Sequence, residues 1–557
     1  MRPHSPFAQR LAGVTPDPSG RRWLYVPYDQ LGHHLGPLAD APAHELGVVL
    51  VEHPGKAARR PYRQQKLAYV LANGRHFALE LAARGVAVRH VVAKTPTYRD
   101  TLRPLAAELG PLAVMEPAER ELRRDLQPLL DEGALVALPH PGWLTTRADF
   151  VQGTGAAPPW RMDRFYKHVR RRTGVLMDGR GKPMGGRFSF DGENRQPWKG
   201  EPPAPTPPTF APDAVTQEVG DLIARRFGHH PGTLDLTALP ATQADAERVW
   251  AWAKAACLPH FGPWEDAMSR RSHSLFHTRL SPLLNLQRLS AQRVLDDALA
   301  LDIPLNSKEG FVRQLIGWRE FVRHVHRDTD GFRTQATTRD GPGDGGWGRW
   351  RGAEWPGSAD PQALGGADPQ ALVGTDPVPP AFWGTPSGLS CLDTVVAELW
   401  ATGYTHHIPR LMVLANLATL LGVAPRDLAD WFWVAYVDAY DWVVEPNVLG
   451  MGTYGVGDLM TTKPYVSGAA YIDKMSDYCQ GCAFDPKTTC PITRLYWAFL
   501  ARNTPALADN MRVKLPLASC RKRSAAQQAE DERVFAAVRA ALQAGERLTP
   551  DALAGQG

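Results

Sequence analysis

The stretches "ELGVVLVEHP" (residues 45–54) and "GVAVRHVVAK" (85–94) decide the fold class of the N-terminal part of the chain. Both are short apolar runs rich in β-branched residues, which is typical of buried parallel strands. Between them, "QKLAYVLANGRHFALELAARG" (65–85) has the periodicity of an amphipathic helix and ends at a glycine. With "RWLYVPYDQL" (22–31) as a further strand, this βαβ pattern predicts a doubly wound parallel sheet over about 22–150.

The length and composition are those of a globular protein with more than one domain. The 557 residues exceed what one hydrophobic core usually organises, and 43% are apolar and 22% charged. No run approaches the roughly 18 apolar residues of a membrane span, and "MRPHSPFAQRLAG" lacks the apolar core of a signal peptide. We therefore expect a cytoplasmic monomer without membrane contact. The net charge of +5 permits a nucleic-acid partner without requiring one.

Changes in composition divide the chain further. We expect an N-terminal extension (1–21), an α/β domain (22–150), an interdomain connection rich in Gly, Pro and Arg (151–212), a helical domain (213–520) and a C-terminal tail (521–557). Within the helical domain, residues 336–380 contain the repeat "ADPQALGGADPQAL" and are predicted to form a flexible insertion. After Ala525 the tail reads as a polar helix with little to bury.

A cysteine cluster lies near the end of the helical domain, in "SDYCQGCAFDPKTTCP". It has the pattern C-x2-C-x7-C, formed by Cys479, Cys482 and Cys490. Thiolates bind zinc or iron–sulfur clusters, and both normally take four protein ligands. Cys391 is the best fourth ligand, because it begins the helix pattern "CLDTVVAELW", where a helix N-terminus stabilises a thiolate. Cys257 is expected in an apolar core and Cys520 at the surface. Iron–sulfur, zinc and unliganded thiols stay open at this point.

Four helical stretches carry polar residues where a simple bundle would not need them. They are "LFHTRLSPLLNLQRLS" (275–290), "NSKEGFVRQLIGWREFVRHVH" (306–326), "YTHHIPRLMVLANL" (404–417) and "WFWVAYVDAYDWVVEPNVLGMGTYGVG" (431–457). Thr278, Arg279 and Ser281 stand at an expected helix start, which suits a phosphate. His406 and His407 precede Pro409, which suits the first turn of a helix. Taken singly, each stretch is more typical of core packing than of a site.

Taken together, these stretches resemble the cryptochrome/photolyase family over about residues 22–510. The closer resemblance is to its iron–sulfur branch, the bacterial cryptochromes and prokaryotic (6-4) photolyases. It is carried by "RMDRFYKHVRRRTGVLMDGRGKPMGGRFSFDGENRQPW" (161–198), "TKPYVSGAAYIDKMSDYCQGC" (462–482) and "CPITRLYWAFLARN" (490–503). The resemblance implies the photolyase/cryptochrome architecture, in which the α/β domain is followed by a larger all-α domain that binds FAD.

The resemblance also implies a role for individual positions. A 4Fe–4S cluster would be bound by Cys391, Cys479, Cys482 and Cys490. FAD would be bound by His277, Thr278, Ser281, Gln314, Arg319, Asp438 and Asn447. Electrons would reach the flavin through Trp383, Trp431 and Tyr440. In repair, His407 would donate a proton beside His406, and Leu411, Tyr465 and Tyr471 would line the lesion site.

Two further ligands are implied at other positions. Asp191 and Asp266 would help to hold a divalent cation such as Mg²⁺. Asp29 and Glu52 would lie at a ribityllumazine-type antenna, although Lys56 stands where an acid is expected. The DNA backbone would meet the basic segments 164–172 and 521–523.

Three functions follow as hypotheses. The first is an enzyme, a light-driven DNA lyase that reverses (6-4) photoproducts in ultraviolet-damaged DNA. The second is a blue-light photoreceptor of the same fold, which signals through flavin redox change without repair. The third is a metal-stabilised nucleic-acid-binding module without flavin, which flavin absorption would distinguish from the other two.

Overall fold

The N-terminal domain is built on a parallel five-stranded sheet with the strand order β3-β2-β1-β4-β5. The structure is a computed structural model that describes residues 5–335, 338–342, 365–372 and 374–554. The strands are β1 (Arg22–Tyr25), β2 (Leu46–Glu52), β3 (Ala87–Val92), β4 (Leu112–Met115) and β5 (Leu135–Leu138). The chain first builds outward through β2 and β3 and then returns to β4 beside β1, which confirms the predicted doubly wound sheet.

Helices cover this sheet. They are α1 (Pro6–Val14), α2 (Pro37–Asp40), α3 (Pro54–Ala57), α4 (Gln64–Ala83), α5 (Tyr98–Leu109) and α6 (Arg120–Asp131). The predicted amphipathic helix is α4, which is buried on most sides because it also packs against α9 of the next domain. The N-terminal extension is ordered as α1, whose Phe7 is 1% exposed between α4 and α9.

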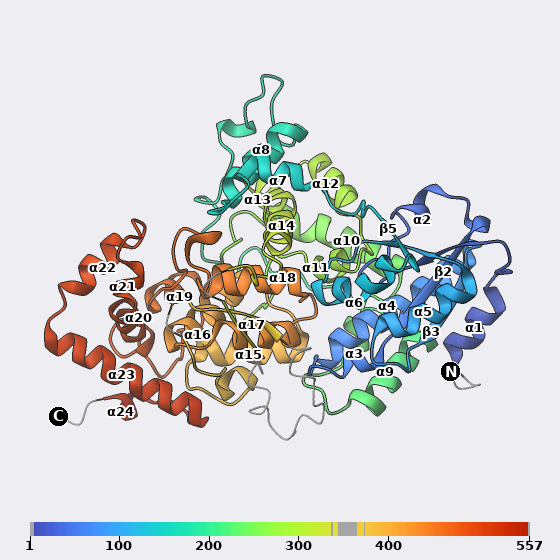
Figure 1. The fold of residues 1–557 in the computed structure, drawn as a ribbon. Helices are drawn as coiled ribbons and strands as arrows, with labels where there is room; N and C mark the ends of the chain where they lie inside the picture. Colours follow the sequence, from blue (N-terminus) through green and yellow to red (C-terminus); the bar gives the residue numbers. More distant parts are fainter. Residues whose placement is uncertain (1–4, 336–337, 343–364, 373, 555–557) are drawn as a thin grey trace.

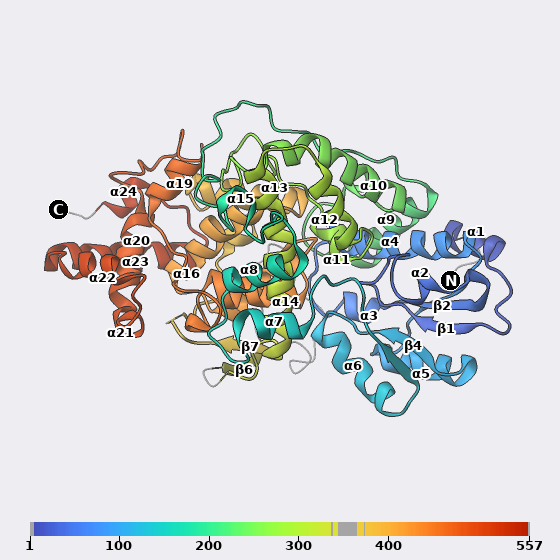
Figure 2. The same cartoon turned by 90° about the horizontal axis from the view of Figure 1, so that it is seen from above.

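The rest of the described chain is mainly helical (Figures 1 and 2). The connection contains α7 (Arg147–Thr154) and α8 (Met162–Thr173). The helical domain contains α9 (Ala214–Phe227), α10 (Gln243–Trp252), α11 (Ser281–Asn285), α12 (Ala291–Ala300), α13 (Leu305–Val312), α14 (Glu320–Asp328), α15 (Ser390–Thr402), α16 (Asn416–Leu421), α17 (Pro425–Ala435), α18 (Asp441–Glu445), α19 (Ala469–Met475) and α20 (Pro491–Arg502). The chain ends in α21 (Thr504–Leu507), α22 (Lys514–Arg521), α23 (Ala525–Ala544) and α24 (Pro550–Leu553). None of the described helices is long and apolar enough to cross a membrane.

Besides the short π-helical segment Ala253–Cys257, three longer ones interrupt the described helical domain, at Arg313–Arg319, Pro409–Ala415 and Pro446–Gly452. A π-turn inserts a residue into the helix and redirects its side chains, and such turns are frequent at functional sites. All three carry residues that the sequence places at the flavin or the lesion, among them Gln314, Leu411 and Asn447.

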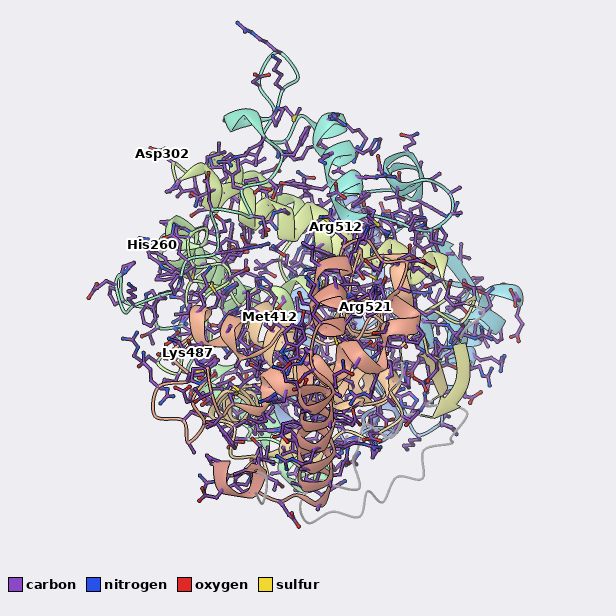
Figure 3. All side chains as sticks on the ribbon, turned by 90° about the vertical axis from the view of Figure 1, so that its left-hand side faces the viewer. His260, Asp302, Met412, Lys487, Arg512 and Arg521 are labelled. Atoms are coloured by element: carbon purple, nitrogen blue, oxygen red, sulfur yellow. The ribbon has the colours of Figure 1, made fainter. Side chains whose placement is uncertain are left out.

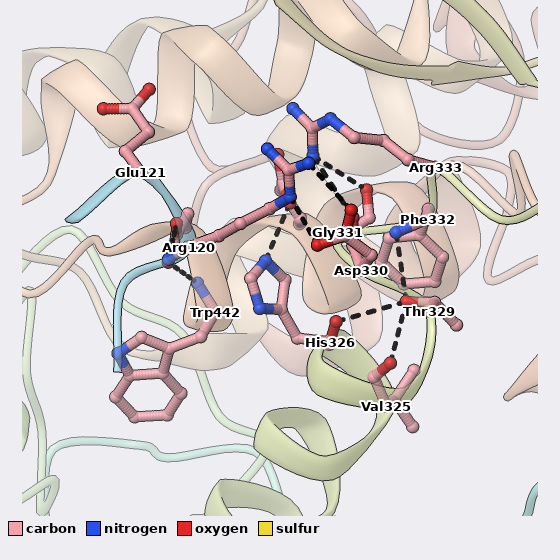
Figure 4. A network of polar contacts seen from close by, with 12 residues as sticks. Arg120, Glu121, Val325, His326, Thr329, Asp330, Gly331, Phe332, Arg333 and Trp442 are labelled. Carbon is pink, nitrogen blue, oxygen red and sulfur yellow. Dashed lines mark hydrogen bonds and ion pairs between the residues drawn. The ribbon is translucent and has the colours of Figure 1, made fainter. Parts of the chain in front are cut away.

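A polar network joins the two domains (Figure 4). Arg120, in the first turn of α6, donates from its Nε and one terminal nitrogen to the carboxylate of Asp330, beyond the end of α14, both at 2.7 Å. The backbone N–H groups of Arg120 and Trp442 both donate to Asp441 at 2.6 Å. His326 lies 2.9 Å from Glu445, so a buried acid of α18 is also satisfied here. The network fixes the α/β domain against α14 and α18, which border the site described below.

The C-terminal tail differs from the expectation of a helix with little to bury. Val534, Val538 and Leu542 of α23 are at most 5% exposed and face α20, the helix that follows Cys490. Arg539 pairs with Asp376, which ties α23 to the segment before α15. The prediction that Cys520 is exposed is also wrong: its side chain is buried in α22, where the thiol lies 3.8 Å from the carbonyl of Trp497. Cys257 is buried as predicted.

The predicted insertion at 336–380 lies partly outside the described residues. Its described ends form an antiparallel pair, β6 (Thr338–Pro342) with β7 (Gly365–Pro369). After β7, the backbone N–H of Ala371 donates to the carbonyl of Gly455, so this end packs on the helical domain.

Candidate active site

Two adjoining cavities occupy the centre of the helical domain. The outer cavity, of about 830 Å³, is lined by Leu411, Tyr465 and Tyr471. The inner cavity is about 250 Å³ and lies behind it. Six residues line both cavities and form the boundary between them: Gln314, Trp318, His407, Arg410, Val443 and Asn447. A group bound in the inner cavity would therefore be in contact with a group bound in the outer one.

The inner cavity brings together every residue that the resemblance places at FAD. These are His277, Thr278, Ser281, Gln314, Arg319, Asp438 and Asn447. Arg319 carries the clearest signature of a missing anion. One of its terminal nitrogens pairs with Glu320 at 2.7 Å, whereas its Nε and second terminal nitrogen are buried without a hydrogen-bond acceptor. Because buried donors are normally satisfied, these two indicate a ligand with acceptor oxygens.

Asp438 anchors the opposite wall of the inner cavity. Its carboxylate accepts a hydrogen bond from Ser281 at 2.6 Å and a bidentate pair from Arg410 at 3.0 Å. Arg410 also stacks over the ring of Tyr436, 4.0 Å from its centroid. Ser281 and Asp438 come from α11 and from the loop before α18, so this contact holds two distant segments around the cavity.

Three histidines gather at the boundary between the cavities. The rings of His277 and His406 are stacked, with centroids 4.1 Å apart, and His407 lies edge-on to His277 at 5.3 Å. His277 Nε2 lies 3.1 Å from the carbonyl of Glu265, which only accepts, so this nitrogen carries the proton. Burial lowers the pKa of His277 and His406, and these two imidazoles are therefore neutral at physiological pH. The side chain of His407 is 42% exposed, and partial desolvation together with the charges of Arg313 and Arg410 lowers its pKa.

Acidic residues stand on the outer-cavity side of His407. Asp266 Oδ1 lies 3.8 Å from His407 Nε2, and burial together with the charge of Glu265 raises the pKa of Asp266 to about 7. Burial and the Asp266 carboxylate also raise the pKa of Tyr471. Asp191 and Asp266 lie at the same cavity, but Arg195 pairs with both of them. The predicted divalent cation stays a prediction, since a guanidinium already neutralises its two expected ligands.

A path of aromatic rings leads away from the cavities. Phe432 and Tyr436 line the outer cavity, and Trp431 lies 5.1 Å from Phe432. Trp431 is followed by Trp400 at 6.4 Å, and Trp400 stacks on Trp383 at 5.2 Å.

The structure thus connects two of the predicted electron-transfer residues, Trp383 and Trp431, through Trp400, which the sequence reasoning missed. Trp400 is an aromatic residue on the apolar side of α15, and only the tertiary stacking distinguishes it from a core residue. Tyr440 is elsewhere: it lines a cavity of the α/β domain, because its place before α18 turns it toward that domain.

The cysteines predicted as cluster ligands line one small cavity: Cys391, Cys479, Cys482 and Cys490. Cys391 lies in the first turn of α15 and Cys490 is the N-cap of α20. Burial and the neighbouring thiols raise the pKa of Cys391, and burial raises that of Cys490 to about 12. Buried thiols with raised pKa values become thiolates together only beside a strong positive charge such as that of a bound metal.

The α/β domain has its own cavity, of about 110 Å³, lined by Glu52 and Lys56. Glu52 is held by Arg75 at 2.6 Å and His90 at 3.2 Å, and Lys56 pairs with Glu119 at 2.5 Å. Asp29, the other predicted antenna residue, does not line this cavity; its carboxylate accepts from the backbone of Ala118. The polar groups expected for an antenna are thus already engaged, and we assign no antenna ligand.

The predicted DNA-binding segments are only partly available. In 164–172, Arg170 is 0% exposed and donates to the carbonyls of Val175, Leu176 and Phe188, so it organises the connection. Arg172 pairs with Asp149. In 521–523, Arg523 pairs with Asp531, whereas Arg521 and Lys522 are exposed.

Comparison with solved structures agrees with this architecture. A bacterial class III photolyase from Agrobacterium tumefaciens matches with a TM-score of 0.52 at 16% identity, over 93% of this chain and 99% of that one. A cryptochrome from Synechocystis sp. PCC6803 matches with a TM-score of 0.50 at 16% identity, over 92% of this chain and 94% of that one. The two-domain fold is thus the fold of photolyases and cryptochromes.

Sequence comparison narrows the assignment. The family model described as "Deoxyribodipyrimidine photo-lyase-related protein" matches residues 24–238. A protein of Agrobacterium fabrum named (6-4) photolyase is 32% identical over 508 residues, which cover 88% of this chain and 94% of the relative. The chain therefore belongs to the cryptochrome/photolyase family, in the branch of the iron–sulfur bacterial cryptochromes and prokaryotic (6-4) photolyases.

Proposed function

We propose that this protein is a light-driven DNA lyase that repairs (6-4) pyrimidine photoproducts. One observation carries the proposal: His407 lines both cavities, facing Tyr465, Tyr471 and Leu411 on one side and the expected flavin residues on the other. The similarity to a protein named (6-4) photolyase supports the choice of lesion.

The inner cavity suits FAD. The Nε and the second terminal nitrogen of Arg319 can donate hydrogen bonds to the oxygens of a diphosphate. Thr278 and Ser281 line the same cavity. Arg410, which pairs with Asp438, and Asn447 stand at the boundary, where the isoalloxazine would approach the outer cavity. When bound, FAD supplies the light absorption and the electron that drive the repair.

The chain's own residues handle the proton and the lesion. A flipped (6-4) photoproduct would rest against Leu411, Tyr465 and Tyr471, whose apolar and aromatic surfaces replace the lost base stacking. His407 holds its imidazole toward that position. Asp266 has a pKa of about 7, so a large part of it is protonated at neutral pH. Its Oδ1 lies 3.8 Å from His407 Nε2. In this relay His407 gives the proton of one ring nitrogen to the lesion while its Nε2 takes a proton from protonated Asp266, so that the imidazole stays neutral and Asp266 becomes a carboxylate.

The four cysteines suit a 4Fe–4S cluster better than a zinc ion. In a tetrahedral zinc site with Zn–S bonds of about 2.3 Å, the sulfurs stand roughly 3.8 Å apart. The four cysteines line one cavity, yet among the described residues no three of them bring their sulfurs within 4.8 Å of one another. The sulfurs therefore do not form a closed zinc tetrahedron, which favours the cluster. Its place between α15 and α20 suits a structural clamp that joins segments distant in sequence.

The direct test uses purified protein, blue light and an oligonucleotide with a single (6-4) photoproduct. The proposal predicts loss of the lesion under light and no loss in the dark. A matched oligonucleotide with a cyclobutane dimer tests the choice of lesion. Bound FAD that is reduced by light, with the (6-4) lesion intact, would contradict the lyase and favour the photoreceptor function.

A further inference from the structure

A short segment between α21 and α22, residues 508–513, is anchored beside the outer cavity. The Asn510 side-chain amide donates to the hydroxyl of Tyr454 and to the carbonyl of Thr462, both at 3.0 Å. Val513 is 6% exposed and anchors the other end of the segment in the core. The segment therefore has a fixed position against the loop that contains Thr462.

That loop is part of the rim of the outer cavity. Lys463, the residue after Thr462, is exposed and lines the cavity together with Tyr465. Burial raises the pKa of Tyr465, and the charges of Arg195 and Arg512 oppose this rise. The guanidinium of Arg512 is thus within electrostatic reach of a residue inside the cavity. The hydrogen bond from Asn510 to the carbonyl of Thr462, next to the cavity-lining Lys463, thus places the segment beside the opening.

The exposed surface of this segment and of α22 combines apolar and basic side chains. Met511 is 74% and Leu515 81% exposed, and both are among the most exposed large apolar residues of the described chain. Arg512 and Lys514 are exposed between them, and Arg521 and Lys522 follow at the end of α22. Figure 3 faces the C-terminal helices and shows Arg512 and Arg521 on this side of the molecule. No ion pair within the described ranges involves any of these four cations, although acids pair with many other arginines of the chain.

We propose that residues 511–515 contact the DNA beside the lesion, as an addition to the lesion cavity. The inference rests on the function proposed above. Arg512 and Lys514 would bind phosphates of the strand that leaves the cavity. Met511 and Leu515 would pack on the sugars and base faces that become exposed where the lesion leaves the stack.

A nucleic acid accounts for both halves of this surface. Exposed apolar side chains alone would suit a protein partner equally well. Four unpaired cations around them favour a polyanion, and the position at the rim of the cavity puts the surface where flanking DNA must pass. In Figure 1, α22 lies at the left-hand end of the molecule and α8, which carries the basic segment 164–172, lies at the upper edge, so the two basic surfaces are separate.

The charge contribution is tested with the double variant R512A/K514A. Binding of a duplex with one (6-4) lesion is measured by fluorescence anisotropy at several salt concentrations. The slope of log K against log salt is negative, and each lost phosphate contact makes it less steep by about 0.9. The double variant should therefore have a slope that is less steep by about 2. The matched control is R225A/R226A, which removes two exposed arginines from α9, a helix of the same domain that packs against α4 of the α/β domain. An unchanged slope, or an equal fall in the control, would overturn the proposal.

The apolar contribution is tested with M511A/L515A. This variant should weaken binding of the damaged duplex more than binding of a damaged single strand, because only the duplex opens a gap when the lesion leaves it. Equal weakening of both substrates would overturn the apolar contact. If the wild-type chain instead forms a dimer that M511A/L515A dissociates, the surface is a protein interface and the proposal is wrong.

The same measurements distinguish failure of the proposed function from failure of the DNA contact by residues 511–515. If the wild-type protein neither binds nor repairs the lesion, the proposed function fails. If it repairs a damaged single strand, and both double variants bind the duplex as the wild type does, the proposed function stands and only the contact by residues 511–515 fails.

Discussion

The imidazole rings of His277 and His406 stack with an interplanar angle of 10° and a centroid distance of 4.1 Å. Together with His407 they bring their nitrogens within 4.8 Å of one another, a spacing that resembles a metal site. Histidine coordinates a metal in the plane of its ring, at about 2.0–2.1 Å. Two nearly parallel planes separated by the thickness of a stacked ring do not meet at such a point. The cluster is therefore better understood as fixed, neutral imidazoles around the proton donor.

This arrangement predicts graded effects of histidine substitutions on repair. His407→Ala removes the proposed donor and should lower the repair rate by about 100-fold or more, with unchanged flavin content. His277→Ala removes the ring that holds His406 in place and should have a smaller effect. His277→Phe, which keeps a stacked ring, should recover part of the loss. Repair rates on a (6-4) oligonucleotide measure all three, and a His407→Ala variant with the wild-type rate would refute the assignment.

The cysteine cavity predicts a difference between two buried cysteines. Cys391→Ser removes one of the four sulfurs around the cavity and should lower the iron content and the melting temperature, because the cluster joins α15 to α20. Cys520→Ser changes a buried thiol outside the cavity and should leave the iron content unchanged. Elemental analysis of both proteins, purified without oxygen, decides the point. Zinc in place of iron in the wild-type protein would contradict the cluster.

The sequence predicted those features that repeat locally or that a family motif marks. The strands and α4 follow from apolar periodicity. The contact between Ser281 and Asp438 joins residues far apart in the chain, and no local pattern shows it; only the motifs of the family placed both at one ligand. The prediction that the tail buries little is wrong because the apolar stripe of α23, formed by Val534, Val538 and Leu542, stands among alanines and polar residues. At four-residue spacing this stripe is the signal that α23 packs against α20.

The aromatic path predicts a role for Trp400. Trp400→Phe places a ring that is hard to oxidise between Trp383 and Trp431. We expect it to slow the light-driven reduction of the bound flavin as much as Trp431→Phe does. Repair by protein that has been reduced chemically should stay at the wild-type rate. The measurement is the flavin absorption during illumination.

Two control variants test the path. Trp497→Phe changes a tryptophan of α20 that contacts Tyr496, outside the path, and should have no effect. Tyr440→Phe should also have none, because Tyr440 lies at the α/β cavity. A Trp400→Phe protein whose flavin is reduced at the normal rate would exclude Trp400 from the path.

An ion pair between the domains predicts how stability depends on pH. Glu80 of α4 accepts hydrogen bonds from Arg288 of the helical domain at 2.8 and 2.9 Å and lies 3.3 Å from His33. Burial would raise the pKa of Glu80, but the hydrogen bonds from His33 and Arg288 outweigh it and lower the pKa to about 2. A carboxyl with a lowered folded-state pKa stabilises the protein above its unfolded pKa, and this contribution is lost as the pH falls through about 4.5 toward 2.

Glu80→Gln should therefore lower the melting temperature at pH 7, by an amount equivalent to roughly 3 kcal/mol or less. Toward pH 3 the melting temperatures of the wild type and the variant should converge, because the stabilisation by the ionised Glu80 carboxylate is then being lost. Glu132→Gln is the matched control: its pair with Arg103 is half exposed, and such pairs contribute about 0–1 kcal/mol. A difference between wild type and Glu80→Gln that is the same at pH 7 and pH 3 would show that the stabilisation comes from packing rather than from the charge of Glu80.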